Sequence, residues 1–180
     1  MALIKTVKPK DAQGGMKNIY NSFLDAVGMI PPPLMISSAS PTLQALKATI
    51  MHYYSEHPRL SPKLIALIRY ITSVIFEAEP CIQFNAHHLK MLGVKEDQIE
   101  ELGINGESVP LDERESALYR FVVKALKRPE AVSEEDIESL REFGWTDADI
   151  FDALNAASNM IGPGVIMKAL KVEQVSGSKV

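Results

Sequence analysis

Cys81 and His88 are the residues of this chain whose types and spacing are best suited to chemistry. Cys81 is the only cysteine among 180 residues, and His88 follows it seven positions later. A thiolate is the nucleophilic form of cysteine, and a neighbouring imidazole can lower the thiol pKa. On a helix that begins near Pro80, the two side chains share a face but lie about 10 Å apart along the axis. The spacing therefore predicts a thiol and a proton carrier that need a bridging water, substrate or partner residue.

Each of these two residues also has a plainer interpretation. A single cysteine in a helical protein is more often an inert buried side chain, and a single histidine is more often a hydrogen-bonded, half-buried one. The chain has no second thiol that could resolve an oxidised sulfur. Both interpretations remain open from the residues alone.

Arg69 is the one charged residue inside the most apolar segment of the chain, Leu64 to Phe76. An arginine buried among apolar side chains needs a partner for its charge. Glu77 or Glu79 would supply a structural ion pair, or the aliphatic stem would carry the charge out to solvent. The functional alternative is that Arg69 anchors an anion or a carboxylate in a pocket.

The net charge, the cysteine count and the lengths of the apolar runs exclude several classes of protein. A net charge of −4 offers no basic surface for nucleic acid. One cysteine rules out an internal disulfide framework or a multi-cysteine metal site and favours a reducing compartment such as the cytoplasm. The first residues lack the apolar core of a signal peptide, and no apolar run is long enough to span a bilayer. The histidines show no metal-ligand spacing, so we expect no metal site. We also expect no cofactor and no membrane partner.

The chain is predicted to be all-α, because the alternating apolar and polar runs typical of strands are absent. Serine, threonine or aspartate at helix starts, and glycine or proline at helix ends, mark the boundaries. The predicted helices cover residues 16–27, 41–55, 62–77, 80–92, 95–102, 112–127, 133–143 and 146–161, with a short segment to 170. Pro31-Pro32-Pro33 is interpreted as a spacer, and Gly162-Pro163-Gly164 is expected to break the last helix. We expect one domain over residues 1–175 and a disordered tail over 176–180.

The stretch around Cys81 comprises an apolar helix that opens with Leu60-Ser61-Pro62, then Cys81 and His88, then a turn at Leu92-Gly93-Val94. This order and spacing resemble the AhpD-like and carboxymuconolactone decarboxylase superfamily. In the family this region carries two cysteines in a Cys-x-x-Cys motif, followed by the histidine.

In the second half of the chain, a helix over residues 112–127 is followed by a helix start at Val132 to Asp136, a turn at Phe143 to Asp147 and a final helix. This series is similar to the peroxidase-related branch of that superfamily. The resemblance covers about residues 15–173. It implies an antiparallel bundle of seven to eight helices that forms a homo-oligomer through helical faces, with the active site near the subunit interface.

The resemblance also implies roles for individual residues. In the peroxidase branch one cysteine attacks the peroxide, a second resolves the sulfenic acid, and a histidine with a glutamate moves protons. By position, Cys81 matches the first cysteine and His88 the histidine, whereas Phe84 stands in the place of the second cysteine. Glu77 is a carboxylate in the neighbourhood but not at the family's acidic position, where Leu64-Ile65-Ala66 stands.

Three functions follow from these matches and departures. The first is an alkylhydroperoxidase-like oxidoreductase that reduces peroxides through Cys81, with His88 as proton shuttle and Phe84, Arg69 and Glu77 at the substrate. Because Phe84 cannot resolve a sulfenic acid, this cycle needs an external thiol donor. The second is a lyase for a small lactone or carboxylic acid, with His88 as acid and base and Arg69 on the carboxylate. The third is a non-enzymatic oligomer that binds a small ligand or a protein partner.

Overall fold

The computed structural model describes residues 3–105 and 110–172 of the chain, and all regular structure in them is helical. The prediction of an all-α chain is confirmed. The predicted tail at 176–180 lies outside the described residues. The elements are η1 (Pro9–Asp11), α1 (Gly14–Val27), α2 (Pro32–Ser37), α3 (Pro41–Ser55), α4 (Pro62–Ile75), α5 (Glu79–Met91), α6 (Glu96–Asn105), α7 (Glu113–Lys127), η2 (Pro129–Ala131), α8 (Glu134–Glu142) and α9 (Asp147–Ala169).

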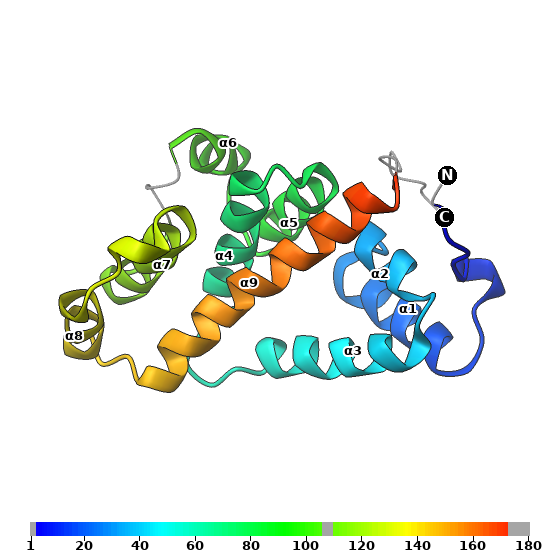
Figure 1. Cartoon of the computed structure of the whole chain (residues 1–180), viewed down its shortest axis with the longest axis horizontal. Helices are drawn as coiled ribbons and strands as arrows, with labels where there is room; N and C mark the ends of the chain where they lie inside the picture. The colour runs from blue at the N-terminus through cyan, green and yellow to red at the C-terminus, as the bar shows by residue number, and fades with distance from the viewer. Residues whose placement is uncertain (1–2, 106–109, 173–180) are drawn as a thin grey trace.

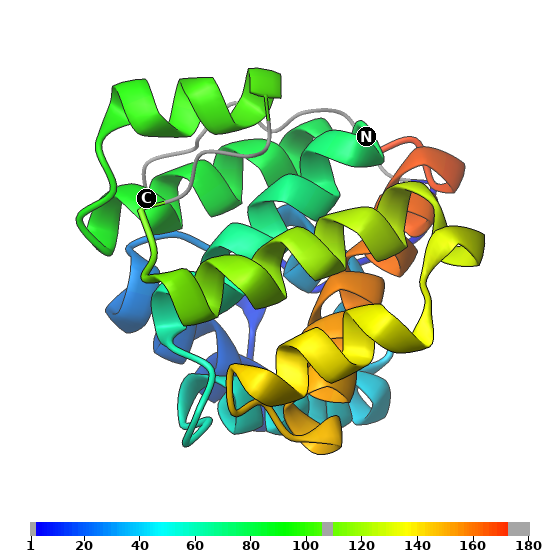
Figure 2. The same ribbon diagram turned by 90° about the vertical axis from the view of Figure 1, so that its left-hand side faces the viewer.

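Helix α4 is the centre of the molecule. It begins as the sequence predicts, with Pro62 in its first turn and the Ser61 hydroxyl accepting a hydrogen bond from the Leu64 N–H at 3.1 Å. Helices α5, α7 and α9 pack against it. In Figure 1 α9 crosses the molecule over α4, and Figure 2 shows α7 between α4 and α8. Leu67 and Ile68 of α4 are fully buried, and each contributes about 1.5–3 kcal/mol of hydrophobic stabilisation.

Two proline segments behave differently from the sequence prediction. Pro31-Pro32-Pro33 is more than a spacer, because Pro32 and Pro33 open the short helix α2. Proline is tolerated in the first turn of a helix, where its missing N–H has no intrahelical partner. With α2 included, the described residues hold nine α-helices, one more than the predicted upper limit.

The predicted break at Gly162-Pro163-Gly164 does not occur, since α9 continues through it to Ala169. Proline at position 163 removes the N–H that would reach the carbonyl of Asn159 one turn earlier. Packing overrides this local penalty. A Cβ atom at Gly164 would lie 3.3 Å from the Cβ of Ala78, so the glycine allows α9 to approach the start of α5 closely.

A small apolar cluster forms at that approach. It is made of buried residues from α2, the start of α5 and the second half of α9, namely Ile36, Ala78, Cys81, Met160 and Met167. It is separate from the main core around α4, α7 and the first half of α9. The fold therefore brings the single cysteine to the place where three helices distant in sequence meet.

Helix α3 is tied to α9 by side chains near its C-terminal end. The Tyr54 hydroxyl donates to the Asp152 carbonyl at 2.9 Å and accepts from Asn155 Nδ2 at 2.8 Å. His57 Nε2 lies 3.3 Å from Asp152 Oδ2, while its Nδ1 accepts the backbone N–H of Leu60 at 2.9 Å. These bonds fix α3 opposite α9, with a space between the two helices.

The start of α9 is held by Asp149, which is buried. Thr146 and Asp149 form a capping box, and Arg59 Nε donates to Asp149 Oδ2 at 2.7 Å. Burial alone would raise the pKa of Asp149, but the hydrogen bonds from Thr146 and Arg59 outweigh it and hold the pKa below the usual value. The carboxylate thus stabilises the helix that forms one wall of the space beside α3.

None of the helices within the described ranges is long and apolar enough to cross a membrane.

Candidate functional site

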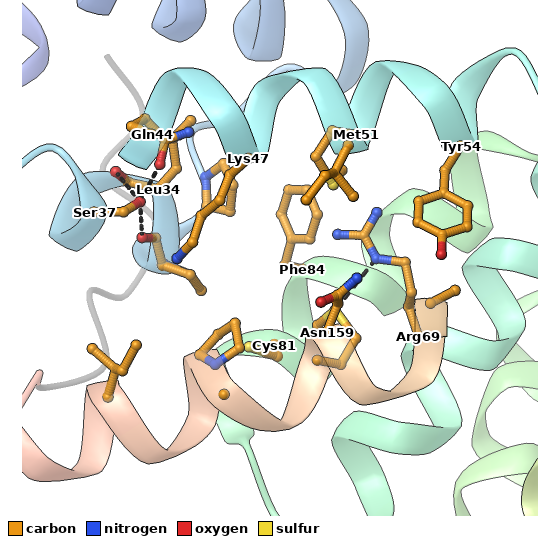
Figure 3. A pocket seen from close by; sticks show the side chains of 18 of the residues that line it. Leu34, Ser37, Gln44, Lys47, Met51, Tyr54, Arg69, Cys81, Phe84 and Asn159 are labelled. Atoms are coloured by element: carbon orange, nitrogen blue, oxygen red, sulfur yellow. Dashed lines mark hydrogen bonds between the residues drawn. The ribbon is translucent and has the colours of Figure 1, made fainter. Parts of the chain in front are cut away.

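A pocket of about 310 Å³ lies between α3 and α9, with α5 behind it (Figure 3). Its volume is at the lower end of the range for small-molecule sites. Most of its surface is apolar. The lining residues are Phe23, Pro31, Pro33, Leu34, Ser37, Gln44, Lys47, Ile50, Met51, Tyr54, Arg69, Cys81, Phe84, Ala156, Ser158, Asn159, Met160, Gly162, Pro163 and Ile166.

Cys81 is in the third position of α5, and its thiol lines this pocket. The side chain is only 2% exposed. The helix begins at Glu79 after the turn that follows α4, and Cys81 N donates to the carbonyl of Ala78 at 2.8 Å. In the first turn of a helix the thiolate is favoured by the positive end of the helix dipole. The site therefore contains a buried thiol that only a molecule inside the pocket can reach.

Arg69 projects from α4 into the same pocket. Its Nε donates to the Met160 sulfur at 3.4 Å, a weak acceptor that leaves the charge unneutralised. Within the described residues no carboxylate forms an ion pair with it. The expected pairing with Glu77 or Glu79 is therefore wrong. Arg69 is half-buried, and a partly desolvated cation without a carboxylate partner is costly, which favours the interpretation that Arg69 meets a ligand.

Burial and Arg69 act in opposite directions on Cys81. Burial raises the pKa of the Cys81 thiol, and the nearby positive charge of Arg69 partly lowers it again. Burial likewise lowers the pKa of the Arg69 guanidinium, while its proximity to Cys81 and Tyr54 raises it. Arginine remains protonated at neutral pH even so. The pocket thus holds a permanent cation that stabilises negative charge on or near the sulfur.

Phe84 lies one turn after Cys81 and also lines the pocket. It is 7% exposed, and its ring fills the space where the resemblance places a second cysteine. Figure 3 shows the ring between Lys47 on one side and Arg69 on the other. The position that would resolve an oxidised thiol is instead part of the apolar wall.

His88 and Glu77 do not line the pocket. Glu77 is exposed in the turn between α4 and α5, where it has a positive φ of 52°. His88 is half-buried on α5, two helical turns beyond Cys81, and its Nδ1 is buried without a hydrogen-bond partner among the described residues. Burial, then Arg69, then His87 lower the pKa of His88, so the imidazole is neutral near pH 7. The predicted roles of both residues remain predictions.

Several residues of the site were not found from the sequence. Lys47 and Asn159 line the pocket from α3 and α9, and neither belongs to a recognisable motif. Asn85 is fully buried and holds α5 on α4, because its Nδ2 donates to the Cys81 carbonyl at 2.9 Å and to Ser73 Oγ at 3.2 Å. In the sequence, Asn85 could have been recognised as a residue that positions Cys81, because it follows Cys81 by four residues and therefore lies on the same face of the helix.

No protein-family model matches the chain, and no curated protein is similar to it in sequence. Solved structures nevertheless superpose well. A peroxidase-related protein from Ralstonia eutropha JMP134, described as an alkylhydroperoxidase AhpD core, gives a TM-score of 0.80 at 17% identity over 96% of this chain and 91% of the other. A peroxidase-related protein from Silicibacter sp. TM1040 gives 0.77 at 19% identity over 93% and 91%.

The debrominase Bmp8 is a further structural neighbour. It gives a TM-score of 0.76 at 14% identity over 97% of this chain and 92% of the other. A cysteine-to-alanine variant of Bmp8 has been solved in complex with 2,3,4-tribromopyrrole. Similarity at these identities establishes architecture, and the chain has the all-helical fold of the AhpD-like, peroxidase-related proteins.

Proposed function

We propose that this chain is a thiol-dependent oxidoreductase that reduces an organic hydroperoxide at Cys81. The observation that carries the proposal is the placement of the only cysteine on the wall of an apolar pocket, beside the unpaired cation of Arg69. Two of the structural neighbours are described as peroxidase-related, which agrees with this chemistry.

The first step is attack of the Cys81 sulfur on the terminal oxygen of the hydroperoxide. A sulfur–oxygen bond forms, the oxygen–oxygen bond breaks, and the sulfur is oxidised to a sulfenic acid while the peroxide is reduced. The other oxygen leaves as an alkoxide. The proton that the thiol gives up is taken up by this alkoxide, so an alcohol is released.

Arg69 is suited to stabilise both charges of this step. A fixed cation in a water-poor pocket stabilises a thiolate before attack and a developing alkoxide during it, without reorganising in the transition state. His88 is proposed to take and return the proton. Its neutral imidazole can accept one, but one water spans only about 5.6 Å between two partners, so a chain of waters would have to connect the roughly 10 Å along α5. The attack itself therefore depends on Cys81 and Arg69, which line the pocket, and the unpartnered Nδ1 of His88 could bind the last water of the chain.

The cycle is closed by external thiols, because no second thiol is present in the chain. The first thiol condenses with the sulfenic acid, releasing water and leaving a mixed disulfide on Cys81. The second attacks this disulfide, releasing an external disulfide and the Cys81 thiol. Ile50 and Ile166, which are 44% and 42% exposed, line the pocket where it meets solvent and leave a path for these reactants.

The lyase alternative has less support from this geometry. A general acid or base must lie within hydrogen-bond reach of the substrate, directly or through one water. No histidine, aspartate or glutamate of the described residues lines the pocket. The non-enzymatic alternative differs from the peroxidase in predicting that the wild type consumes no hydroperoxide.

The test is consumption of cumene hydroperoxide in the presence of dithiothreitol. We expect the wild type to consume hydroperoxide at a rate proportional to protein concentration, and Cys81→Ser to fall to the background rate. Equal rates for the two proteins would refute the proposal. Cys81→Ala serves as a second variant, so that a folding defect of one substitution is not mistaken for loss of the thiol.

A further inference from the structure

We propose that the hydroperoxide substrate carries a carboxylate at the end remote from the peroxide, and that Lys47 binds this carboxylate. The inference rests on the proposed function, and it names the class of substrate. It follows from the charges of the pocket, from the arrangement of its polar groups, and from its size.

The charges that line the pocket are all positive. Arg69 and Lys47 are the charged residues of the lining, and no aspartate or glutamate within the described ranges accompanies them. Lys47 also forms no ion pair with any described residue. An uncompensated pair of cations inside an otherwise apolar pocket raises the local concentration of anions and favours an anionic ligand. This is notable in a chain with a net charge of −4.

The two cations have different surroundings. Arg69 is close enough to Cys81 to alter the pKa of the thiol, so its charge is engaged at the reacting end of the pocket. Lys47 is half-buried on α3, and in Figure 3 it lies on the other side of Phe84, near Ser37 and Gln44. Lys47 is thus free to bind a second group of the same ligand.

Hydrogen-bonding groups gather beside Lys47. Gln44 precedes Lys47 by three residues, which places both side chains on one face of α3. Gln44 is 4% exposed, and its amide contacts the hydroxyl of Ser37. An ammonium and an amide at the edge of an apolar pocket match a carboxylate, whose two oxygens accept charge-assisted hydrogen bonds.

The space between the two ends is apolar. Phe84 and Met51 line it, so the body of the ligand is an apolar group such as an aryl ring or a short alkyl chain. A volume of about 310 Å³ admits a small molecule of this kind and excludes a large lipid. The substrate class is therefore a small apolar acid that bears a hydroperoxide.

The first test compares cumene hydroperoxide with its para-carboxylate derivative, two substrates that differ by one carboxylate group. We expect the wild type to show a kcat/KM about tenfold higher for the acid, the value of one charge-assisted hydrogen bond. Lys47→Gln should abolish this preference, and Lys47→Glu should reverse it. Lys17→Gln, which removes an exposed lysine of α1 outside the pocket, is the control and should retain the preference. A wild type without preference, or a preference that survives Lys47→Gln, overturns the inference.

The second test separates the substrate class from the chemistry. Para-isopropylbenzoate has no peroxide, and its binding to Cys81→Ser protein can be measured by calorimetry against the neutral para-cymene. We expect tighter binding of the acid, about tenfold weaker after an added Lys47→Gln substitution. Binding of the acid without any hydroperoxide turnover by the wild type would refute the proposed function and keep the carboxylate site. Turnover of cumene hydroperoxide without acid preference or acid binding would keep the function and refute the carboxylate site.

Discussion

Replacing Phe84 with cysteine should convert the single-thiol site into a dithiol site. Residues three apart on an α-helix have Cα atoms about 5 Å apart, within the range of 4.4–6.8 Å that a disulfide spans. Phe84 and Cys81 line the same pocket from the first two turns of α5, so the new thiol would face the existing one. After oxidation of Cys81, the thiol at position 84 should displace the sulfenic hydroxyl as water and form an internal disulfide.

The substitution also has a predictable effect on stability. The Phe84 ring is 7% exposed, and removing a buried aromatic ring costs about 3 kcal/mol, the lower end of the usual range. The lower end applies because the vacated space opens into the existing pocket. For a domain of this size we expect a melting temperature lower by about 6–12 °C. Phe84→Ser leaves a similar space without a thiol and is the matched control.

The assay treats each reduced protein with one equivalent of hydroperoxide and then counts free thiols and traps sulfenic acid with dimedone. We expect a dimedone adduct in the wild type and in Phe84→Ser. In Phe84→Cys we expect loss of both free thiols and no adduct. If Phe84→Cys still gives the adduct and keeps a free thiol, position 84 does not face Cys81 as the structure places it, and the reasoning is refuted.

Four further predictions concern the surroundings of the site. Arg69→Met should slow alkylation of Cys81 by iodoacetamide at neutral pH several-fold, because loss of the cation raises the thiol pKa, and Arg69→Lys should alter the rate less. The melting temperature of Arg69→Met should be unchanged or higher, since a half-buried charge without an ion-pair partner is removed. His88→Gln should lower kcat by about 100-fold if the imidazole moves the proton, whereas a change below about threefold would show that it does not. Tyr119→Phe should raise the melting temperature by about 2–4 °C, because the buried hydroxyl has no partner among the described residues. Asp149→Asn should lower the free energy of unfolding at pH 7 by about 1–2 kcal/mol, as measured by thermal melts. Because the folded-state pKa of Asp149 is depressed, the difference from wild type should be complete above about pH 4, and it should vanish as the pH falls through the folded-state pKa.

Much of the helical architecture was readable from local features of the sequence. Ser61 with Pro62 starts α4, and the side chain of Asp112 caps α7 by accepting the N–H of Glu115 at 2.7 Å, both as predicted. These boundaries depend on interactions within one turn, which sequence patterns record well. Pro163 shows the opposite case, because packing of α9 outweighs a local tendency to break.

The site was predictable only in part, for the same physical reason. Cys81, Phe84 and Arg69 were singled out from the sequence, and the structure places all three on one pocket. Lys47 and Asn159 come from helices far apart in the chain, and only the packing of α3 against α9 brings them together. A pattern within one helix predicts which residues share a face, whereas the opposite wall of a pocket depends on tertiary contacts.

The most direct measurement of the central claim follows one turnover at Cys81. Reduced protein is mixed with one equivalent of cumene hydroperoxide and dimedone, and the modified residue and the cumyl alcohol are quantified by mass spectrometry and chromatography. We expect a dimedone adduct on Cys81 and an equal amount of cumyl alcohol. An unmodified Cys81 thiol, whether or not the hydroperoxide is consumed, would contradict it.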